Sequence, residues 1–305
     1  MSGPILVTTA TGKQGSAAIR ALLKLPSPPS TILAVTRSAA SAGAQKLASS
    51  SPTIKLVEGT LKNVPALFDA AARLTDRPIW GVYSIQLPQG MDIADEEIQG
   101  KSLIDEALAR GAKHFVYSSV DRGGTDKSWS NPTDIPHFRT KHNIELYLRE
   151  KAKGSAMTWT ILRPVAFMDN LAPGMQSRVF LASLNSTLKP GQPLQWIACR
   201  DIGVFAAKAF ENPSEYDGKA IGLAGDELTV DQTSEAFKDV TGEALTPTWS
   251  ILGSALKLVS AELRAMINWF GSEGYGADIE AVRKMHPALM DLRTWIAEDS
   301  KFEKK

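Results

Sequence analysis

Cysteine and metal-ligand patterns are scarce in this sequence. Its 305 residues include one cysteine, Cys199, which excludes an intrachain disulfide and a cysteine-rich metal site. The four histidines lie at positions 114, 137, 142 and 286 and show none of the spacings that zinc sites use. We therefore expect no bound metal.

An excess of charge and long hydrophobic runs are also missing. The sequence has 34 Lys and Arg residues against 33 Asp and Glu residues, so nothing indicates nucleic acid or an anionic membrane as a partner. No apolar run is long enough to cross a bilayer, and the apolar stretch 5–23 is interrupted by Lys13 and Arg20. These absences predict a cytoplasmic protein, with the nucleus as the alternative compartment.

The sequence does contain a strand, a glycine-bearing turn and a helix within residues 5–23. Residues 5–7 form an apolar run typical of a buried strand, and apolar residues recur at helical spacing after Gly15. Between them lie Thr9, Ala10, Thr11, Gly12, Lys13, Gln14 and Gly15. This order is typical of a dinucleotide-binding turn, in which Gly12 lets the backbone approach a pyrophosphate and Gly15 lets the helix pack on the strand. The N–H groups of the first helical turn then face the phosphates.

Thr9 stands where such a turn has its first glycine. A β-branched residue is unfavourable at a position that needs a positive φ. Two outcomes are open: a rebuilt turn in which Thr9 is unstrained, or a weakened phosphate site. The alternative to a nucleotide site is a turn whose glycines serve packing only.

The end of the second predicted strand, residues 31–36, bears on the choice of nucleotide. About twenty residues beyond the glycine turn, an NAD enzyme carries an Asp or Glu for the ribose 2′-hydroxyl. This sequence reads Thr36-Arg37-Ser38 at that point. A guanidinium can hold a 2′-phosphate by charge-assisted hydrogen bonds, whereas a carboxylate would repel it. Arg37 therefore predicts NADP(H), and the alternative is an exposed arginine at a strand end.

Apolar strands and helices alternate through the first half of the chain. Further strands are expected at 54–59, 79–85, 114–119 and 157–164, and helices at 64–74, 92–110 and 137–148. This alternation predicts an α/β fold with a doubly wound parallel sheet. Because ligands of such sheets bind at the carboxyl ends of the strands, Ser84, Ile85 and Gln86 are expected to border the cofactor.

The fifth strand and the following helix resemble a short-chain dehydrogenase with altered chemistry. Such enzymes carry a serine at the end of this strand and a Tyr-x-x-x-Lys sequence on the next helix. Ser118 and Ser119 fit the serine position and Lys141 the lysine, but His137 stands in place of the tyrosine. The resemblance implies that Lys141 contacts the cofactor ribose and is a candidate general acid. His137 lies four residues before Lys141 on the same helix face and is either a proton carrier or a surface residue.

The second half of the sequence fits a smaller lobe, as the resemblance to short-chain dehydrogenases implies. We expect a Rossmann domain over residues 1–165 and a C-terminal α/β lobe over 166–305, with a strand at 194–198 that rejoins the main sheet. Thr229 or Asp231, together with Gly242, is expected to cap a helix at 232–241. Apolar spacing predicts a further helix at 252–270. The glycine-rich loop 271–276 is either a cover for a substrate or a plain connection.

Segments along nearly the whole chain resemble the NmrA-like family of atypical short-chain dehydrogenases. They read ATGKQG, VTRS, IQGKSLIDEA, KHFVYSS, HFRTKHNIE, TILRPVAFMDN, LQWIACRDIGVFAAKAFENP, IGLAGDELT and MHPALMDLRTWI. The resemblance implies a Rossmann domain that binds NADP(H) along the sheet edge. It implies cofactor contacts from residues 9–15, Arg37, Thr60, Leu61, Ser84, Ile85, Gln86, Lys101, Lys141, Pro164, Val165 and Phe167. The contact from Lys101 rests on the resemblance alone.

The resemblance leaves two functions open. The first is an NADPH-dependent reductase of a small carbonyl, quinone or enone substrate, with Lys141, Ser118 and His137 as candidate catalytic residues. The second is a non-catalytic NADP(H) sensor that regulates a partner protein, which the missing tyrosine favours. We expect the first.

Overall fold

The computed structural model describes residues 3–86, 93–248 and 261–304, which form two compact units. The first unit comprises Met1–Val120, His137–Arg163 and Arg200–Ile221. The second comprises Asp121–Pro136, Pro164–Cys199 and Gly222–Lys305. The units interleave along the chain, whereas the sequence predicts a single division after residue 165.

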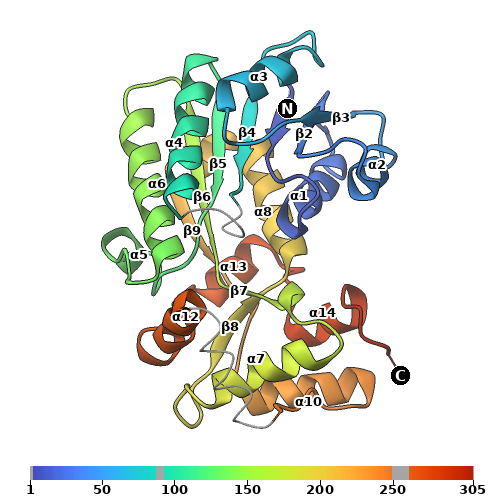
Figure 1. Ribbon diagram of the computed structural model, residues 1–305, viewed down its shortest axis with the longest axis vertical. Helices are drawn as coiled ribbons and strands as arrows, with labels where there is room; N and C mark the ends of the chain where they lie inside the picture. Colours follow the sequence, from blue (N-terminus) through green and yellow to red (C-terminus); the bar gives the residue numbers. More distant parts are fainter. Residues whose placement is uncertain (1–2, 87–92, 249–260, 305) are drawn as a thin grey trace. The chain divides into compact units, whose positions relative to one another are not determined.

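A seven-stranded sheet forms the centre of the first unit (Figure 1). Its strands are β1 (Ile5–Val7), β2 (Ile32–Thr36), β3 (Ile54–Glu58), β4 (Gly81–Ser84), β5 (His114–Ser118), β6 (Thr158–Pro164) and β9 (Lys219–Leu223). They lie in the order β3-β2-β1-β4-β5-β6-β9, and the pairs from β3 to β6 are parallel. This order is that of the doubly wound Rossmann fold, which confirms the fold class predicted from the alternation.

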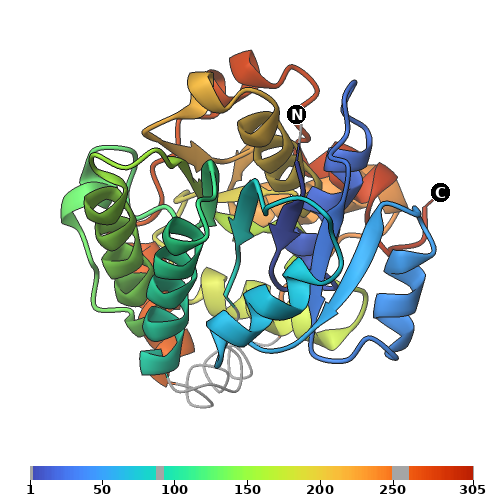
Figure 2. The same ribbon diagram turned by 90° about the horizontal axis from the view of Figure 1, so that it is seen from above.

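Helices cover both faces of this sheet (Figure 2). They are α1 (Lys13–Leu23), α2 (Ala42–Ala48), α3 (Val64–Ala72), α4 (Ile93–Ala109), α6 (Pro136–Ala152), α8 (Cys199–Glu211) and α9 (Pro213–Tyr216). Glycines set two of the closest approaches, since a Cβ on Gly203 of α8 would lie 2.5 Å from the Ala17 carbonyl carbon of α1. A Cβ on Gly100 of α4 would lie 2.5 Å from Cδ1 of Ile144 on α6. With both faces covered, every residue of β1, β2, β4 and β5 is buried, which explains their continuous apolar runs.

The second unit contains a three-stranded sheet in the order β10-β8-β7. Its strands are β7 (Ala166–Phe167), β8 (Leu194–Ile197) and β10 (Asp226–Leu228). The prediction that the strand at 194–198 rejoins the main sheet is wrong. The edges of β8 are taken by β7, which is parallel to it, and by β10, which is antiparallel. β9 takes the place beside β6 instead.

Short helices complete the second unit. They are α5 (Lys127–Ser130), η1 (Met168–Asn170), α7 (Met175–Asn185), α10 (Val230–Thr241), α12 (Ala261–Ser272), α13 (Ile279–Met285) and α14 (Leu292–Glu298). The caps of α10 are confirmed, because Thr229 and Gln232 form a capping box and Gly242 ends the helix with φ +84°. The helix predicted at 252–270 corresponds in part to α12, and its first residues, 252–260, lie outside the described residues. None of the helices within the described ranges is long and apolar enough to cross a membrane.

Candidate functional site

The turn between β1 and α1 has a left-handed backbone at the position where such turns carry their first glycine. Thr9 has φ +52°, so it accepts a conformation that β-branched residues disfavour. Its hydroxyl donates a hydrogen bond of 2.9 Å to the carbonyl of Ile85, just after β4. Thr8 also bonds Ile85, accepting from its N–H at 2.7 Å. The turn is therefore not rebuilt around an unstrained Thr9, because a side-chain hydrogen bond holds this residue in the strained conformation. A weakened phosphate site stays a prediction.

The two glycines of this turn are both crowded by Thr9. A Cβ on Gly15 would lie 2.3 Å from the Thr9 carbonyl oxygen, so only glycine lets α1 pack this closely on the turn. A Cβ on Gly12 would lie 3.0 Å from Cγ2 of Thr9. Gly12 is the N-cap of α1 and provides no side-chain cap, which leaves the start of this eleven-residue helix suited to an anion.

Gln14 links this turn to the neighbouring strands. Its Oε1 accepts a hydrogen bond of 2.6 Å from the Ser118 hydroxyl at the end of β5. The hydroxyl of Tyr83 on β4 donates to the same oxygen at 3.5 Å. The structure thus brings together Gln14, predicted to bind cofactor, and Ser118, predicted to be catalytic, and the Ser118 hydroxyl proton is committed to Gln14.

Ser84, Ile85 and Gln86 lie where β4 ends, as the sequence predicts. Gln86 is buried and its Nε2 donates to the Ser84 hydroxyl at 2.8 Å. Its Oε1 is buried and has no hydrogen-bond partner among the residues that the structure describes. A buried acceptor without a donor is costly, and a ligand that donates at this point would satisfy it.

Arg37 is exposed just after β2, and a carboxylate from β3 bonds the backbone two residues beyond it. Glu58 ends β3, pairs in register with Thr36, and accepts a hydrogen bond of 2.7 Å from the N–H of Ala39. Strand pairing brings this acid to the loop that contains Arg37, 19 positions beyond Ala39 along the chain. Sequence spacing alone gives no signal for it.

Thr60 and Leu61 follow β3, and Leu61 lines a cavity of about 300 Å³ between the start of α3 and α4. The other lining residues are Lys62, Asn63, Val64, Pro65, Asp95, Ile98, Gln99 and Ser102. The role of Thr60 and Leu61 as cofactor contacts stays a prediction.

The ammonium of Lys141 forms an ion pair with a buried carboxylate. Nζ lies 2.7 Å from Oε1 of Glu96 on α4, and Thr140 donates to the other oxygen, Oε2, at 2.7 Å. Glu96 is 1 % exposed and Lys141 is 9 % exposed. In the sequence, Glu96 is one of several acids at the start of a helix, where the helix dipole already explains them. Only the approach of α4 to α6 identifies it as the partner of Lys141.

His137 and Lys101 lie in other surroundings. His137 is in the first turn of α6, where its ring packs edge-on against Phe138 at 4.7 Å between centroids. Lys101 forms an ion pair with Glu97 on α4 and lies 5.3 Å above the ring of Tyr147 on α6. The catalytic role of His137 and the cofactor contact from Lys101 stay predictions.

Pro164, Val165 and Phe167 belong to the second unit. Pro164 ends β6, and Val165 is buried and donates its N–H to the Leu223 carbonyl at 3.2 Å. Phe167 lies in β7, opposite Ile197 of β8, and is partly exposed. Their roles as cofactor contacts also stay predictions.

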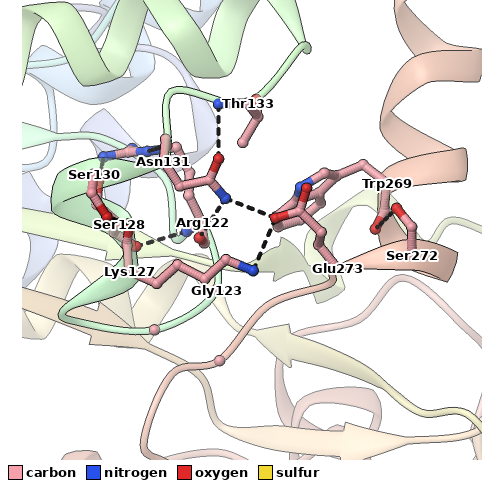
Figure 3. A network of polar contacts seen from close by, with 12 residues as sticks. Arg122, Gly123, Lys127, Ser128, Ser130, Asn131, Thr133, Trp269, Ser272 and Glu273 are labelled. Atoms are coloured by element: carbon pink, nitrogen blue, oxygen red, sulfur yellow. Dashed lines mark hydrogen bonds and ion pairs between the residues drawn. The ribbon is translucent and has the colours of Figure 1, made fainter.

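A polar network in the second unit holds the glycine-rich loop that follows α12 (Figure 3). Glu273 accepts from Nζ of Lys127 at 2.9 Å and from Nδ2 of Asn131 at 2.9 Å. The bond from Lys127 lowers the pKa of the Glu273 carboxyl below its usual range.

Asp121 anchors the other end of the same loop. It accepts hydrogen bonds from the N–H groups of Gly123, Gly124 and Gly276 at 2.9–3.1 Å. The loop is thus fastened near both of its ends by side chains from 121–131.

Metal-binding geometry is not found within residues 3–86, 93–248 and 261–304. No group of three or more His, Cys, Asp or Glu side chains there is arranged to hold a metal ion. Cys199 is buried, and its N–H donates to Oδ2 of Asp169 at 2.8 Å.

Comparison with known proteins decides the family. The profile described as the NmrA-like family matches residues 1–295. This chain belongs to the NmrA-like family. Among curated relatives of this NmrA-like protein is the NmrA-like family domain-containing oxidoreductase FrzB of Cladobotryum sp. The two are 27 % identical over 276 residues, covering 80 % of this chain and 77 % of FrzB.

Solved structures share the fold of this NmrA-like protein. The negative transcriptional regulator NmrA in complex with NADP is 21 % identical, has a TM-score of 0.72, and is matched over 98 % of this chain and 95 % of its own. The NADPH-dependent quinone oxidoreductase QOR2 of Escherichia coli, complexed with NADPH, is also 21 % identical with a TM-score of 0.71. Here the match covers 96 % of this chain and 98 % of that one.

Proposed function

We propose that this NmrA-like protein is an NADPH-dependent reductase of a small carbonyl, quinone or enone compound. The observation that carries the proposal is the β1–α1 turn, where Thr9 keeps the left-handed backbone and Gly15 keeps α1 close. FrzB, described as an oxidoreductase, and the quinone oxidoreductase QOR2 support the reductase over other nucleotide-binding functions.

The residues of the first unit fit a dinucleotide with an extra phosphate. The start of α1 has no side-chain cap and suits a pyrophosphate, and the exposed Arg37 suits a 2′-phosphate. The buried Oε1 of Gln86 offers an acceptor to a ribose hydroxyl or a carboxamide N–H. Lys141, fixed by Glu96, offers N–H groups to the ribose hydroxyls.

The chemistry then divides between the cofactor and the protein. NADPH supplies a hydride when bound. The protein binds and orients the dinucleotide and keeps the Ser118 hydroxyl directed at Gln14.

Turnover tests this proposal directly. Purified protein is mixed with NADPH and a panel of quinones, enones and ketones, and the loss of NADPH absorbance is followed. Oxidation of NADPH that depends on both protein and acceptor supports the reductase. Tight binding of NADPH with no turnover on any acceptor class contradicts it.

That contrary result would favour the second function, a sensor whose partner reads the state of the nucleotide. Two observations support this alternative. His137 stands where short-chain dehydrogenases carry their tyrosine, and the structural neighbour NmrA is described as a negative transcriptional regulator.

Arg37→Asp is expected to shift the nucleotide preference from NADP(H) toward NAD(H). Losing charge-assisted hydrogen bonds to the 2′-phosphate, worth about 1.5–3 kcal/mol, lowers NADPH affinity roughly tenfold to a hundredfold. NADH affinity should change little or rise. Fluorescence titration with both nucleotides measures the ratio, and Arg20→Asp, an exposed arginine on α1, is the control for the same change of charge. An unchanged ratio in Arg37→Asp removes the assignment of this arginine to the 2′-phosphate.

A further inference from the structure

A buried charge pair connects the helix that carries Lys141 to the helix before it. Oε1 of Glu96 lies 2.7 Å from Nζ of Lys141, and Oε2 accepts from the hydroxyl of Thr140 at 2.7 Å. Each carboxylate oxygen therefore receives a hydrogen bond from α6. The Glu96 side chain is 1 % exposed and that of Lys141 is 11 % exposed, so water screens the pair little.

The packing of α4 on α6 determines which residues meet. Gly100 lies one helical turn after Glu96, and Ile144 lies one turn after Thr140. A Cβ on Gly100 would fall 2.5 Å from Cδ1 and 2.8 Å from Cγ1 of Ile144, so α6 uses the space that the glycine leaves. The close contact between Gly100 and Ile144 brings together the helical turns before them, which carry Glu96 and Thr140. Figure 1 shows α4 and α6 side by side.

This arrangement opposes the use of Lys141 as a proton donor. If its ammonium gave a proton to the substrate, a neutral amine would remain beside Glu96. The carboxylate would then be buried without a compensating positive charge, which is strongly unfavourable. The same pair does not oppose hydrogen bonding, because an ammonium has three N–H groups and Glu96 uses one of them.

We propose that Glu96 is a positioning residue that fixes the ammonium of Lys141 and commits it to holding the cofactor rather than protonating the substrate. The inference rests on the proposed reductase function. Reduction of a carbonyl adds a hydride to carbon and a proton to oxygen. The hydride comes from NADPH, which leaves as NADP⁺, and the proton comes from solvent water.

The test separates nucleotide binding from the reduction step. NADPH dissociation constants are measured by fluorescence titration without acceptor. Single-turnover rates are measured with NADPH and a quinone both saturating. The variants are Glu96→Gln, Lys141→Met and the double variant, and Glu106→Gln is the control because it removes another α4 carboxylate, paired with Arg110.

Glu96→Gln and Lys141→Met should each weaken NADPH binding about tenfold or more, the loss expected for a charge-assisted contact. The single-turnover rate at saturation should stay within about tenfold of the starting protein, far less than the loss of a general acid causes. The double variant should bind NADPH no more weakly than Lys141→Met, because the two residues act as one unit. Glu106→Gln should change neither quantity.

Two results would overturn the inference. One is Lys141→Met with unchanged NADPH affinity and a rate that falls by more than about a hundredfold, as expected for a lost general acid. The other is Glu96→Gln with NADPH affinity equal to that of Glu106→Gln. If Glu96→Gln does not fold, Glu96→Asp replaces it, because aspartate keeps the charge but is one methylene shorter and does not reach Lys141. If Glu96→Asp binds NADPH as tightly as the starting protein does, the inference is also overturned.

Failure of the proposed function gives a different pattern. A starting protein that binds NADPH but reduces no acceptor contradicts the reductase, and the titrations still decide whether Glu96 sets the contact of Lys141 with the nucleotide. A starting protein that binds no NADPH overturns both.

Discussion

Thr9 illustrates how a single side chain can compensate for an unfavourable backbone. Its φ of +52° costs a β-branched residue about 1 kcal/mol or more. The hydroxyl recovers part of that free energy by donating to Ile85. Glycine at this position would avoid the strain but would lose the hydrogen bond.

We therefore expect Thr9→Gly and Thr9→Val to differ in stability. Thr9→Gly removes the strain and a hydrogen bond worth about 1 kcal/mol, so the free energy of unfolding should change by less than about 1 kcal/mol. Thr9→Val keeps the strain and loses the bond, and should lower the free energy of unfolding by about 1–2 kcal/mol. Urea unfolding measures both. A Thr9→Val variant as stable as the starting protein would show that the hydroxyl contributes nothing.

His114 shows how burial makes a side chain sensitive to pH. It lies in β5, fully buried, with Nδ1 2.7 Å from the Thr158 hydroxyl and Nε2 3.2 Å from the Thr160 hydroxyl. Burial lowers the pKa of the imidazole from 6.5 to about 4. Between these values the unfolded chain binds a proton that the folded protein does not, so stability falls as the pH falls.

His114→Asn should remove this part of the pH dependence. For such a pKa difference, the contribution of His114 to the free energy of unfolding is about 3 kcal/mol. It is fully present above pH 6.5 and is lost as the pH falls toward 4. The difference in free energy of unfolding between the starting protein and the variant should therefore shift by that order between pH 8 and pH 4. Urea titrations at several pH values measure it. A constant difference across this range would contradict the assignment.

Helices α4 and α6 show what pattern recognition captures and what it leaves out. Their existence follows from apolar spacing and, for α4, from the acids in its first turn, and the structure has them at Ile93–Ala109 and Pro136–Ala152. Their contact does not follow, because Gly100 reads in the sequence as an unfavourable helix residue. The structure explains it as space for Ile144.

Gly100→Ala should destabilise the protein although alanine favours helices. The added methyl would overlap Ile144 at a cost of about 1–3 kcal/mol, against about 1 kcal/mol gained in helix propensity. Ile144→Val removes Cδ1, the nearest atom, so the penalty of Gly100→Ala should be smaller in that background. Urea unfolding of both single variants and the double variant measures this. Additive effects would mean that the two residues do not interact.

Across the whole molecule, segments far apart in the sequence are joined by a few buried polar side chains. In the first unit, Arg163 of β6 and Glu145 of α6 form an ion pair in which both side chains are 0 % exposed. In the second, Asp121 binds N–H groups of its own loop and of Gly276, 155 positions later in the chain. Such acceptors are costly to remove, since the donors stay buried without partners.

Asp121→Ala should loosen the loop after α12 more than loss of the neighbouring ion pair does. Removing the acceptor of Gly123, Gly124 and Gly276 should cost about 2–3 kcal/mol and speed amide hydrogen exchange at these glycines. Lys127→Met breaks the exposed pair with Glu273 and should cost less than about 1 kcal/mol. If amide hydrogen exchange at these glycines is equally fast in the two variants, contacts other than those of Asp121 hold the loop.

The sequence by itself determines the doubly wound sheet, the β1–α1 turn and the caps of α10. These features depend on neighbours within about one turn or on burial of both faces of a strand, so their signals are local. The partners of side chains are different. That Glu96 meets Lys141, that Glu58 reaches the Arg37 loop, and that β9 rather than β8 lies beside β6 all depend on which elements become neighbours. Those contacts join residues 19 or more positions apart, and packing in three dimensions selects them.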